Sequence, residues 1–131
     1  MTISLAYGST TIQLPPDLQW RDEFDWDPVE QSADYSLTGA LIVQEGVKIG
    51  GRPITLFGGE DTAWVTRATV TALFQSTAVA GRKMTLTYHD RVFTVMWRRP
   101  KPIEATEIRR VANPGPDDWY NITINLMEVQ A

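Results

Sequence analysis

Alternating apolar and polar positions run through most of the chain and predict a protein built mainly from β-strands. The clearest run lies near the end, in the segment WYNITINLMEV, where the alternating apolar residues are Tyr120, Ile122, Ile124 and Leu126. Period two with β-branched and aromatic residues is typical of a half-buried strand. Similar patterns predict a hairpin in ISLAYGSTTIQL, closed near Gly8, and further strands in YSLTGALIVQEG and RPITLF.

One segment has the period of a helix instead. Thr66 fits an N-cap, because its hydroxyl can accept a hydrogen bond from a backbone N–H of the first turn. The apolar residues that follow recur at spacings of three and four and form one stripe: Val70, Leu73, Phe74 and Ala78. Gly81 is well placed to end such a helix. We therefore expect one helix over about residues 67–79, with this stripe packed on the sheet.

The only histidine, His89, stands beside Asp90 in KMTLTYHDRVFTVMW. A neighbouring His and Asp invite a catalytic interpretation, but both flanks alternate with period two and predict strands. Asp is common in turns because its side chain bonds to nearby backbone N–H groups, and adjacent turn residues point in different directions, which suits a proton relay poorly. We therefore predict a hairpin connection, slightly longer than two residues because HD lacks the glycine that tight turns favour.

Composition narrows the function classes. A chain of 131 residues is expected to form one domain, residues 1–131, with a hydrophobic core large enough to be stable without disulfides or a structural metal. It has no cysteine and one histidine, which excludes disulfides, thiolate zinc sites and cysteine nucleophiles. The motifs G-x-S-x-G and H-E-x-x-H and a glycine-rich phosphate loop are absent. We therefore predict a protein that is not an enzyme and has no cofactor or metal. Because no long apolar run is present, we also predict a soluble protein that is made without export and does not associate with a membrane.

The net charge of −4 is unevenly distributed along the chain. Residues 1–65 hold ten acids and three bases, a net −7, whereas residues 66–131 hold six acids and nine bases, a net +3. A mixed surface is the simplest interpretation. The alternative is a subunit whose acidic and basic patches meet across copies in a head-to-tail ring.

The densest acidic cluster is DEFDWDPVE, which contains Asp22, Glu23, Asp25 and Asp27. It predicts a solvated loop. Cation binding is the alternative, although the D-x-D-x-D-G register of a calcium loop and its later bidentate Glu are missing.

Aromatic and basic residues supply the other candidate binding positions. Trp20 and Trp26 lie in the acidic region, where tryptophans serve as anchors of a subunit interface or as a sugar-binding surface. The other three tryptophans stand at the edges of predicted elements and are expected in the core or at its rim: Trp64, Trp97 and Trp119. A modest basic cluster comprises Arg98, Arg99, Arg109 and Arg110. It lacks interleaved aromatic residues, so nucleic-acid binding is a weak third interpretation.

Four short patterns form a distinctive set when taken in order. They are GRPITL, a tryptophan before the helix, F-x-V in the hairpin, and Y-x-I-x-I-x-L in the last strand. Over about residues 35–130 the chain resembles the distal tail, or baseplate hub, proteins of long-tailed bacteriophages and prophages. The resemblance implies a tail-tube-like β-sandwich or split barrel with one flanking helix, assembled as a ring, often sixfold, and it implies no active site. Larger members add a receptor-facing domain for which this chain is too short, so we do not expect direct host recognition.

The resemblance therefore predicts a structural protein of the virion tail, made in the bacterial host cytoplasm. Its partners would be its own copies, in a ring that joins the tail tube to the tip, and neighbouring tail proteins, while DNA passes through without tight binding. Tail-tube-like rings present an acidic lumen, which makes these acids the candidates to face the channel or an adjoining ring: Asp22, Glu23, Asp25 and Asp27. The candidates to face neighbouring subunits are Arg98, Arg99, Arg109, Arg110, Trp20 and Trp26. Two alternatives stay open: a tail tube or terminator subunit, and, from a different class, a small carbohydrate-binding β-sandwich that uses Trp20 and Trp26.

Overall fold

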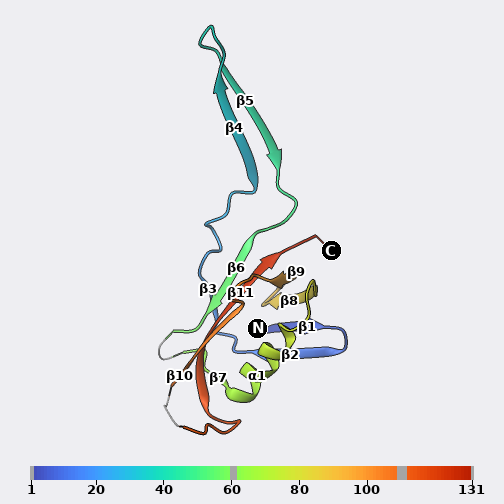
Figure 1. Ribbon diagram of the computed structural model, residues 1–131, viewed down its shortest axis with the longest axis vertical. Coiled ribbons are helices and arrows are strands. Elements are labelled where there is room, and N and C mark those ends of the chain that lie inside the picture. The colour runs from blue at the N-terminus through green and yellow to red at the C-terminus, as the bar shows by residue number, and fades with distance from the viewer. Residues whose placement is uncertain (1, 60–61, 109–111, 131) are drawn as a thin grey trace.

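The computed structural model describes residues 2–59, 62–108 and 112–130. It consists of a β-rich body with one flanking helix and a long two-stranded arm that leaves the body (Figure 1). The prediction of a mainly β fold with one flanking helix is confirmed, and the antiparallel strands are compatible with a β-sandwich.

The body is built on one large antiparallel sheet. Its main path runs β2-β1-β8-β9-β11-β6-β3, and β7 and β10 also pair with β11. The strands of this sheet are β1 (Ile3–Tyr7), β2 (Thr10–Leu14), β3 (Gln19–Trp20), β6 (Pro53–Phe57), β7 (Val65–Thr66), β8 (Met84–Tyr88), β9 (Arg91–Trp97), β10 (Ile103–Glu107) and β11 (Trp119–Glu128).

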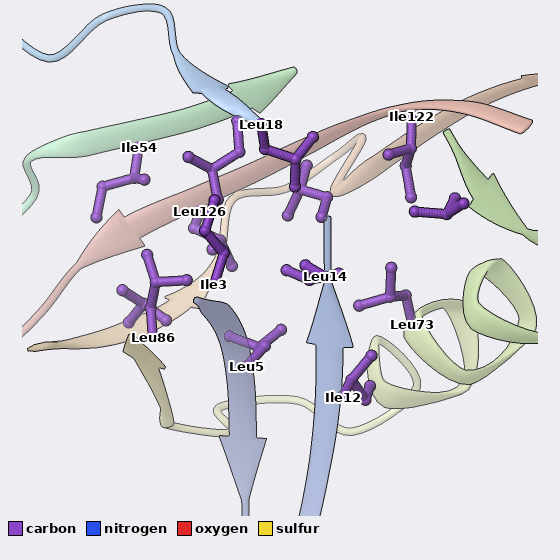
Figure 2. Close-up of a cluster of buried hydrophobic side chains, with 14 of the residues drawn as sticks. Ile3, Leu5, Ile12, Leu14, Leu18, Ile54, Leu73, Leu86, Ile122 and Leu126 are labelled. Atoms are coloured by element: carbon purple, nitrogen blue, oxygen red, sulfur yellow. The ribbon is translucent and has the colours of Figure 1, made fainter. Parts of the chain in front are cut away.

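Strand β11 holds the sheet together. Along its 10 residues it pairs with β7 and β6 on one side and with β10 and β9 on the other. As the alternation predicts, every second side chain is buried: Tyr120, Ile122, Ile124 and Leu126. Apolar side chains from β1, β2, β6, β8, β11 and α1 meet in a single core (Figure 2). Burial of each large aliphatic side chain contributes about 1.5–3 kcal/mol, so this shared core is the main source of stability.

The helix α1 (Arg67–Ser76) begins where the sequence predicts. Thr66 is its N-cap, and the Thr66 hydroxyl accepts a hydrogen bond from the Thr69 backbone N–H at 3.4 Å. Leu73 is fully buried, and Figure 2 shows it in the same core as Ile12 and Ile122. The expected packing of Phe74 is wrong, because this side chain is 69 % exposed.

The helix stops three residues earlier than expected. Its last turn is closed by the Ser76 and Thr77 hydroxyls, which donate to the carbonyls of Leu73 and Phe74, each at 2.6 Å. These side-chain bonds compete with continuation of the helix. Gly81, with φ +73°, lies in the following loop and not at the helix end.

The His89–Asp90 pair forms a hairpin turn, as predicted, but the turn is tighter than expected. Tyr88 pairs directly with Arg91, so only two residues connect β8 and β9. His89 takes the positive φ of 58° that glycine would otherwise supply, and its backbone N–H donates to the Thr2 carbonyl at 2.7 Å. This hydrogen bond ties the turn to the start of the chain.

Two further strands, β4 (Val29–Tyr35) and β5 (Leu41–Val47), form a separate hairpin, which we call the arm. The sequence predicts one strand over YSLTGALIVQEG, but residues 36–40 connect the two strands of the arm and only β5 follows that expectation. Strand β4 begins with the last two residues of the acidic segment and continues through residues for which no strand was predicted. A strand, β10, also lies within the proline-broken stretch after β9. The hairpin predicted at the start of the chain is present as β1 and β2, and Gly8 in its turn has φ +57°.

Candidate assembly surface

The arm has two chemically different faces. Residues directly opposite in an antiparallel pair project from the same side of the hairpin, so the register defines each face. Val29 pairs with Val47, Ala33 with Val43, and Tyr35 with Leu41. These residues, together with Gln31 and Glu45, form what we call the apolar face. The opposite, polar face carries Glu30, Ser32, Asp34, Ile42, Gln44 and Gly46.

Most of the apolar face is left uncovered by the described residues. Tyr35 and Val47 are each 76 % exposed, and Leu37 in the connecting turn is fully exposed. Figure 1 shows the arm extending away from the body, with its turn at the opposite end of the molecule from α1. Apolar surface gathered on one side of a projecting element is typical of an interaction site.

The base of the arm is fixed to the body. The Lys48 backbone N–H donates to the Pro28 carbonyl at 2.9 Å, which closes the arm where its two strands begin and end. The Gly51 N–H donates to the Glu128 carbonyl at 2.7 Å and so joins the exit of the arm to the end of β11. The Lys48 ammonium also lies 5.4 Å from the centre of the Trp26 ring. These contacts close the base of the arm and join it to the end of β11.

Asp22, a candidate to face a channel or an adjoining ring, takes part in a hydrogen-bond network on the body. Its carboxylate accepts hydrogen bonds from the indole N–H of Trp20 at 3.0 Å and from the backbone N–H and hydroxyl of Thr55, both at 2.9 Å. Burial by itself would raise the pKa of Asp22. The hydrogen bonds from Thr55 and the Arg98 guanidinium, 3.7 Å away, outweigh burial and hold that pKa below its usual range.

The other residues of the acidic cluster differ in their exposure. Glu23 forms an ion pair with Arg91 at 2.7 Å and is partly buried. Asp25 and Asp27 are exposed, and the Asp27 carboxylate accepts a hydrogen bond from the Val29 N–H at the start of the arm. Asp25 and Asp27 are therefore exposed acids, although Asp27 also bonds to the arm, whereas Asp22 and Glu23 are partly buried in contacts with distant segments.

The two tryptophans predicted as interface or sugar-binding residues also differ in exposure. Trp20 lies in the core, 7 % exposed, in edge-to-face contact with Tyr88 and Phe93. The guanidinium groups of Arg52 and Arg91 lie 4.6 Å and 5.1 Å from its ring centre. Trp20 thus packs within the chain and offers little surface to a partner or a sugar, while Trp26 stays partly exposed at the base of the arm.

The three tryptophans at the edges of elements differ in how deeply they are buried. Trp97 is buried, as expected, and its indole N–H has no hydrogen-bond partner among the described residues. Trp119 is half exposed, and Trp64 is intermediate, which fits the expected core rim.

A groove of about 590 Å³ lies between the loop after α1 and the ends of β9 and β11. It is lined by residues 77–82, 96–99 and 127. Its apolar lining includes Val79, Met96, Trp97 and Met127. Sequence reasoning missed this groove because its walls come from three segments that are distant along the chain.

Two residues of the predicted basic cluster, Arg98 and Arg99, line this groove. Arg98 donates to the Thr55 hydroxyl at 2.6 Å and to the Asn125 side-chain oxygen at 3.0 Å, so it is largely engaged within the chain. Arg99 is exposed and donates to the Thr77 carbonyl at 2.6 Å. Arg109 and Arg110, the other half of the predicted cluster, lie outside the described residues.

Comparison with known proteins identifies no family for this chain. No family model, curated protein or solved structure matches the chain. Its surface must therefore be interpreted from its own geometry.

Within residues 2–59, 62–108 and 112–130, no group of three His, Cys, Asp or Glu side chains is arranged to hold a metal ion. In the same ranges no helix has the length and apolar character needed to cross a membrane. The most distinctive surface features are the arm and the groove.

Proposed function

We propose that the protein is a non-enzymatic structural subunit that assembles with its own copies into a ring at the tip of a phage tail, joins the tail tube to the tip and lets DNA pass. The observation that carries the proposal is the arm, whose apolar face is exposed at Tyr35, Leu41, Val43 and Val47. A free two-stranded hairpin is marginally stable in water, so an element of this kind gains stability when another surface covers it.

The resemblance to distal tail proteins is the reason for placing the protein in a phage tail and for expecting its copies to form a ring. A subunit with a projecting arm contributes different surfaces to its two neighbours, and repeated contacts of that kind close into a ring when the rotation between copies fits. A tail tube or terminator subunit would use the same geometry. The carbohydrate-binding alternative loses one of its two anchors, since Trp20 is buried and its indole N–H is bonded to Asp22.

Electron microscopy and sedimentation velocity of the full chain test the proposal. We expect closed rings with a central opening and a sedimentation coefficient well above that of a 14.7 kDa monomer. Sugar binding would appear instead as a change of tryptophan fluorescence on titration with glycans. A chain that stays monomeric at millimolar concentration, or that binds glycan as a monomer, would refute the ring.

The gene neighbourhood tests the place in the virion. A tail-tip subunit is expected to be encoded near a tape-measure gene, and antibodies against the chain should label the end of the tail. Labelling elsewhere on the particle would favour the tube or terminator alternative.

A further inference from the structure

The arm carries charge of one sign. Residues 29–47 contain three acids, Glu30, Asp34 and Glu45, and no Lys or Arg. Glu45 lies on the apolar face, whereas Glu30 and Asp34 lie on the polar face. An acceptor surface for the arm must therefore be apolar in its centre and positively charged around it.

The groove beside β9 has this complementary character. Three of its lining residues are cationic, Arg82, Arg98 and Arg99, and no lining residue is acidic among those described. Arg98 is close to Asp22, but neither Arg82 nor Arg99 forms an ion pair with a described residue. Val79, in the same lining, contributes exposed apolar surface.

The arm cannot readily fill the groove of its own chain. Its two strands leave the body side by side at Pro28 and Lys48, and their pairing extends without interruption from Val29 and Val47 to Tyr35 and Leu41. Figure 1 shows this hairpin pointing away from the body that contains β9. The occupant with the matching chemistry is therefore the arm of a second copy.

We propose that the apolar face of the arm, with Tyr35 and Leu41 as anchors, seats in the groove of a neighbouring copy, where Glu45, the one acid on that face, lies near the groove cations Arg82 and Arg99. This assignment rests on the proposed ring and names the contact that builds it. Because the arm and the groove are different surfaces of one chain, the contact is head-to-tail and each copy gives one arm and receives one.

Variants at exposed positions test the two sides of the contact separately. The arm variant is Tyr35→Ser with Leu41→Ser, and the groove variant is Val79→Asp, which places a carboxylate where the acidic arm arrives. Each should weaken association by about 30-fold or more, the change that loss of an interface anchor produces. Circular dichroism should show both variants folded.

Matched controls lie nearby. Ile42→Ser removes an apolar side chain of similar exposure from the polar face, next to Leu41 along the same strand. Val92→Asp introduces the same charge at an exposed position at the other end of β9, outside the groove lining. Both controls should assemble like the parent chain.

Mixing provides the sharpest test. The arm variant keeps an intact groove, and the groove variant keeps an intact arm, so an equimolar mixture retains one complementary contact. We expect a one-to-one dimer that cannot grow into a ring. If the mixture stays monomeric while each variant is folded, the arm does not bind the groove.

Cross-linking can locate the contact because the chain has no cysteine. A chain with both Leu41→Cys and Val79→Cys, treated with a short bis-maleimide, should give a ladder of covalent oligomers that ends at the ring size. Pairing Leu41→Cys with Val92→Cys should give none. A ladder from the second pair, and none from the first, would overturn the assignment to the groove.

The outcomes separate this inference from the proposed function. Rings that survive both the arm and the groove variants would overturn the inference and leave the ring intact. Assembly lost in the arm variant but kept in Val79→Asp would show that the arm seats elsewhere. A parent chain that never associates would refute the contact and the ring together.

Discussion

At the scale of single residues, Asp22 shows how one carboxylate organises its surroundings. It joins Trp20 in β3 to Thr55 in β6 and approaches Arg98 beyond β9, so three segments share one acceptor. Hydrogen bonds to an ionised group contribute more than neutral ones, and a buried donor left without an acceptor is costly. Asp22 is thus a structural residue of the body.

Asp22→Ala should lower the free energy of unfolding by about 1–3 kcal/mol, because it leaves the donors of Trp20 and Thr55 without their acceptor. Asp25→Ala, at an exposed position of the same loop, should change it by less than about 0.5 kcal/mol. Urea unfolding measures both values. Equal effects of the two substitutions would contradict the structural role of Asp22.

The lowered pKa of Asp22 also predicts a pH dependence. A carboxyl whose pKa is depressed by folding stabilises the folded state fully above its unfolded value of about 3.9, and this contribution is lost as the pH falls through the folded pKa. The stability difference between the parent chain and Asp22→Asn should therefore be constant near neutral pH and shrink below about pH 4. A difference that grows on acidification would be inconsistent with the depressed pKa.

His89 occupies a backbone conformation that restricts which residues fit at this position. With φ +58° it occupies a region that β-branched residues avoid. His89→Val should cost about 1–3 kcal/mol of stability, whereas Asp90→Ala should stay within about 0.5 kcal/mol. Thermal unfolding distinguishes the two, and a neutral His89→Val would show that the turn relaxes without strain.

At the scale of elements, α1 contributes mainly through one side chain. Leu73→Ala should cost about 2–5 kcal/mol, since it opens a cavity in the core, while exposed Phe74→Ala should cost little. The two positions are adjacent on the same helix, so a comparison of their urea midpoints separates packing from helix propensity. A large loss from Phe74→Ala alone would mean that its ring is covered in solution, for example by another copy.

The arm should be separable from the body. Pro28 and Lys48 are joined by a backbone hydrogen bond, so residues 29–47 can be replaced by a short glycine linker without moving the strands that follow. None of the buried core residues lies in the arm. We expect the shortened chain to fold with nearly the parent melting temperature and to lose assembly. Collapse of the body would instead place the arm within the folding unit.

At the scale of the whole molecule, charge bears on the proposed passage of DNA. Each Lys or Arg that neutralises a phosphate adds salt-dependent affinity, which would slow transit. The net charge of −4 and the engagement of Arg98 within the chain favour weak contact with DNA. Duplex DNA at low salt should show no appreciable binding to the protein in an anisotropy titration. Tight binding would contradict an acidic passage.

Several features of the molecule followed from local sequence alone. Period-two alternation predicted β1, β2, β8, β9 and β11, because a strand with one buried face must alternate. The N-cap at Thr66 and the helix after it were also predicted, since capping and the apolar spacing are local properties. Phe74 was assigned to the wrong side, because a stripe of mixed apolar residues does not say which of its edges the sheet covers.

Other features of the molecule depend on pairing between residues far apart in the chain, and only the tertiary structure shows them. No strand was predicted for most of β4, and only its register with β5 separates an apolar face from a polar one. Asp22 and Trp20 looked like surface candidates, yet Thr55, more than 30 residues away along the chain, draws the carboxylate into a network within the body. The groove exists only where three separate segments meet. Sequence thus determined the local elements, whereas the surfaces available to a partner depend on contacts between residues far apart in the chain, which no local pattern records.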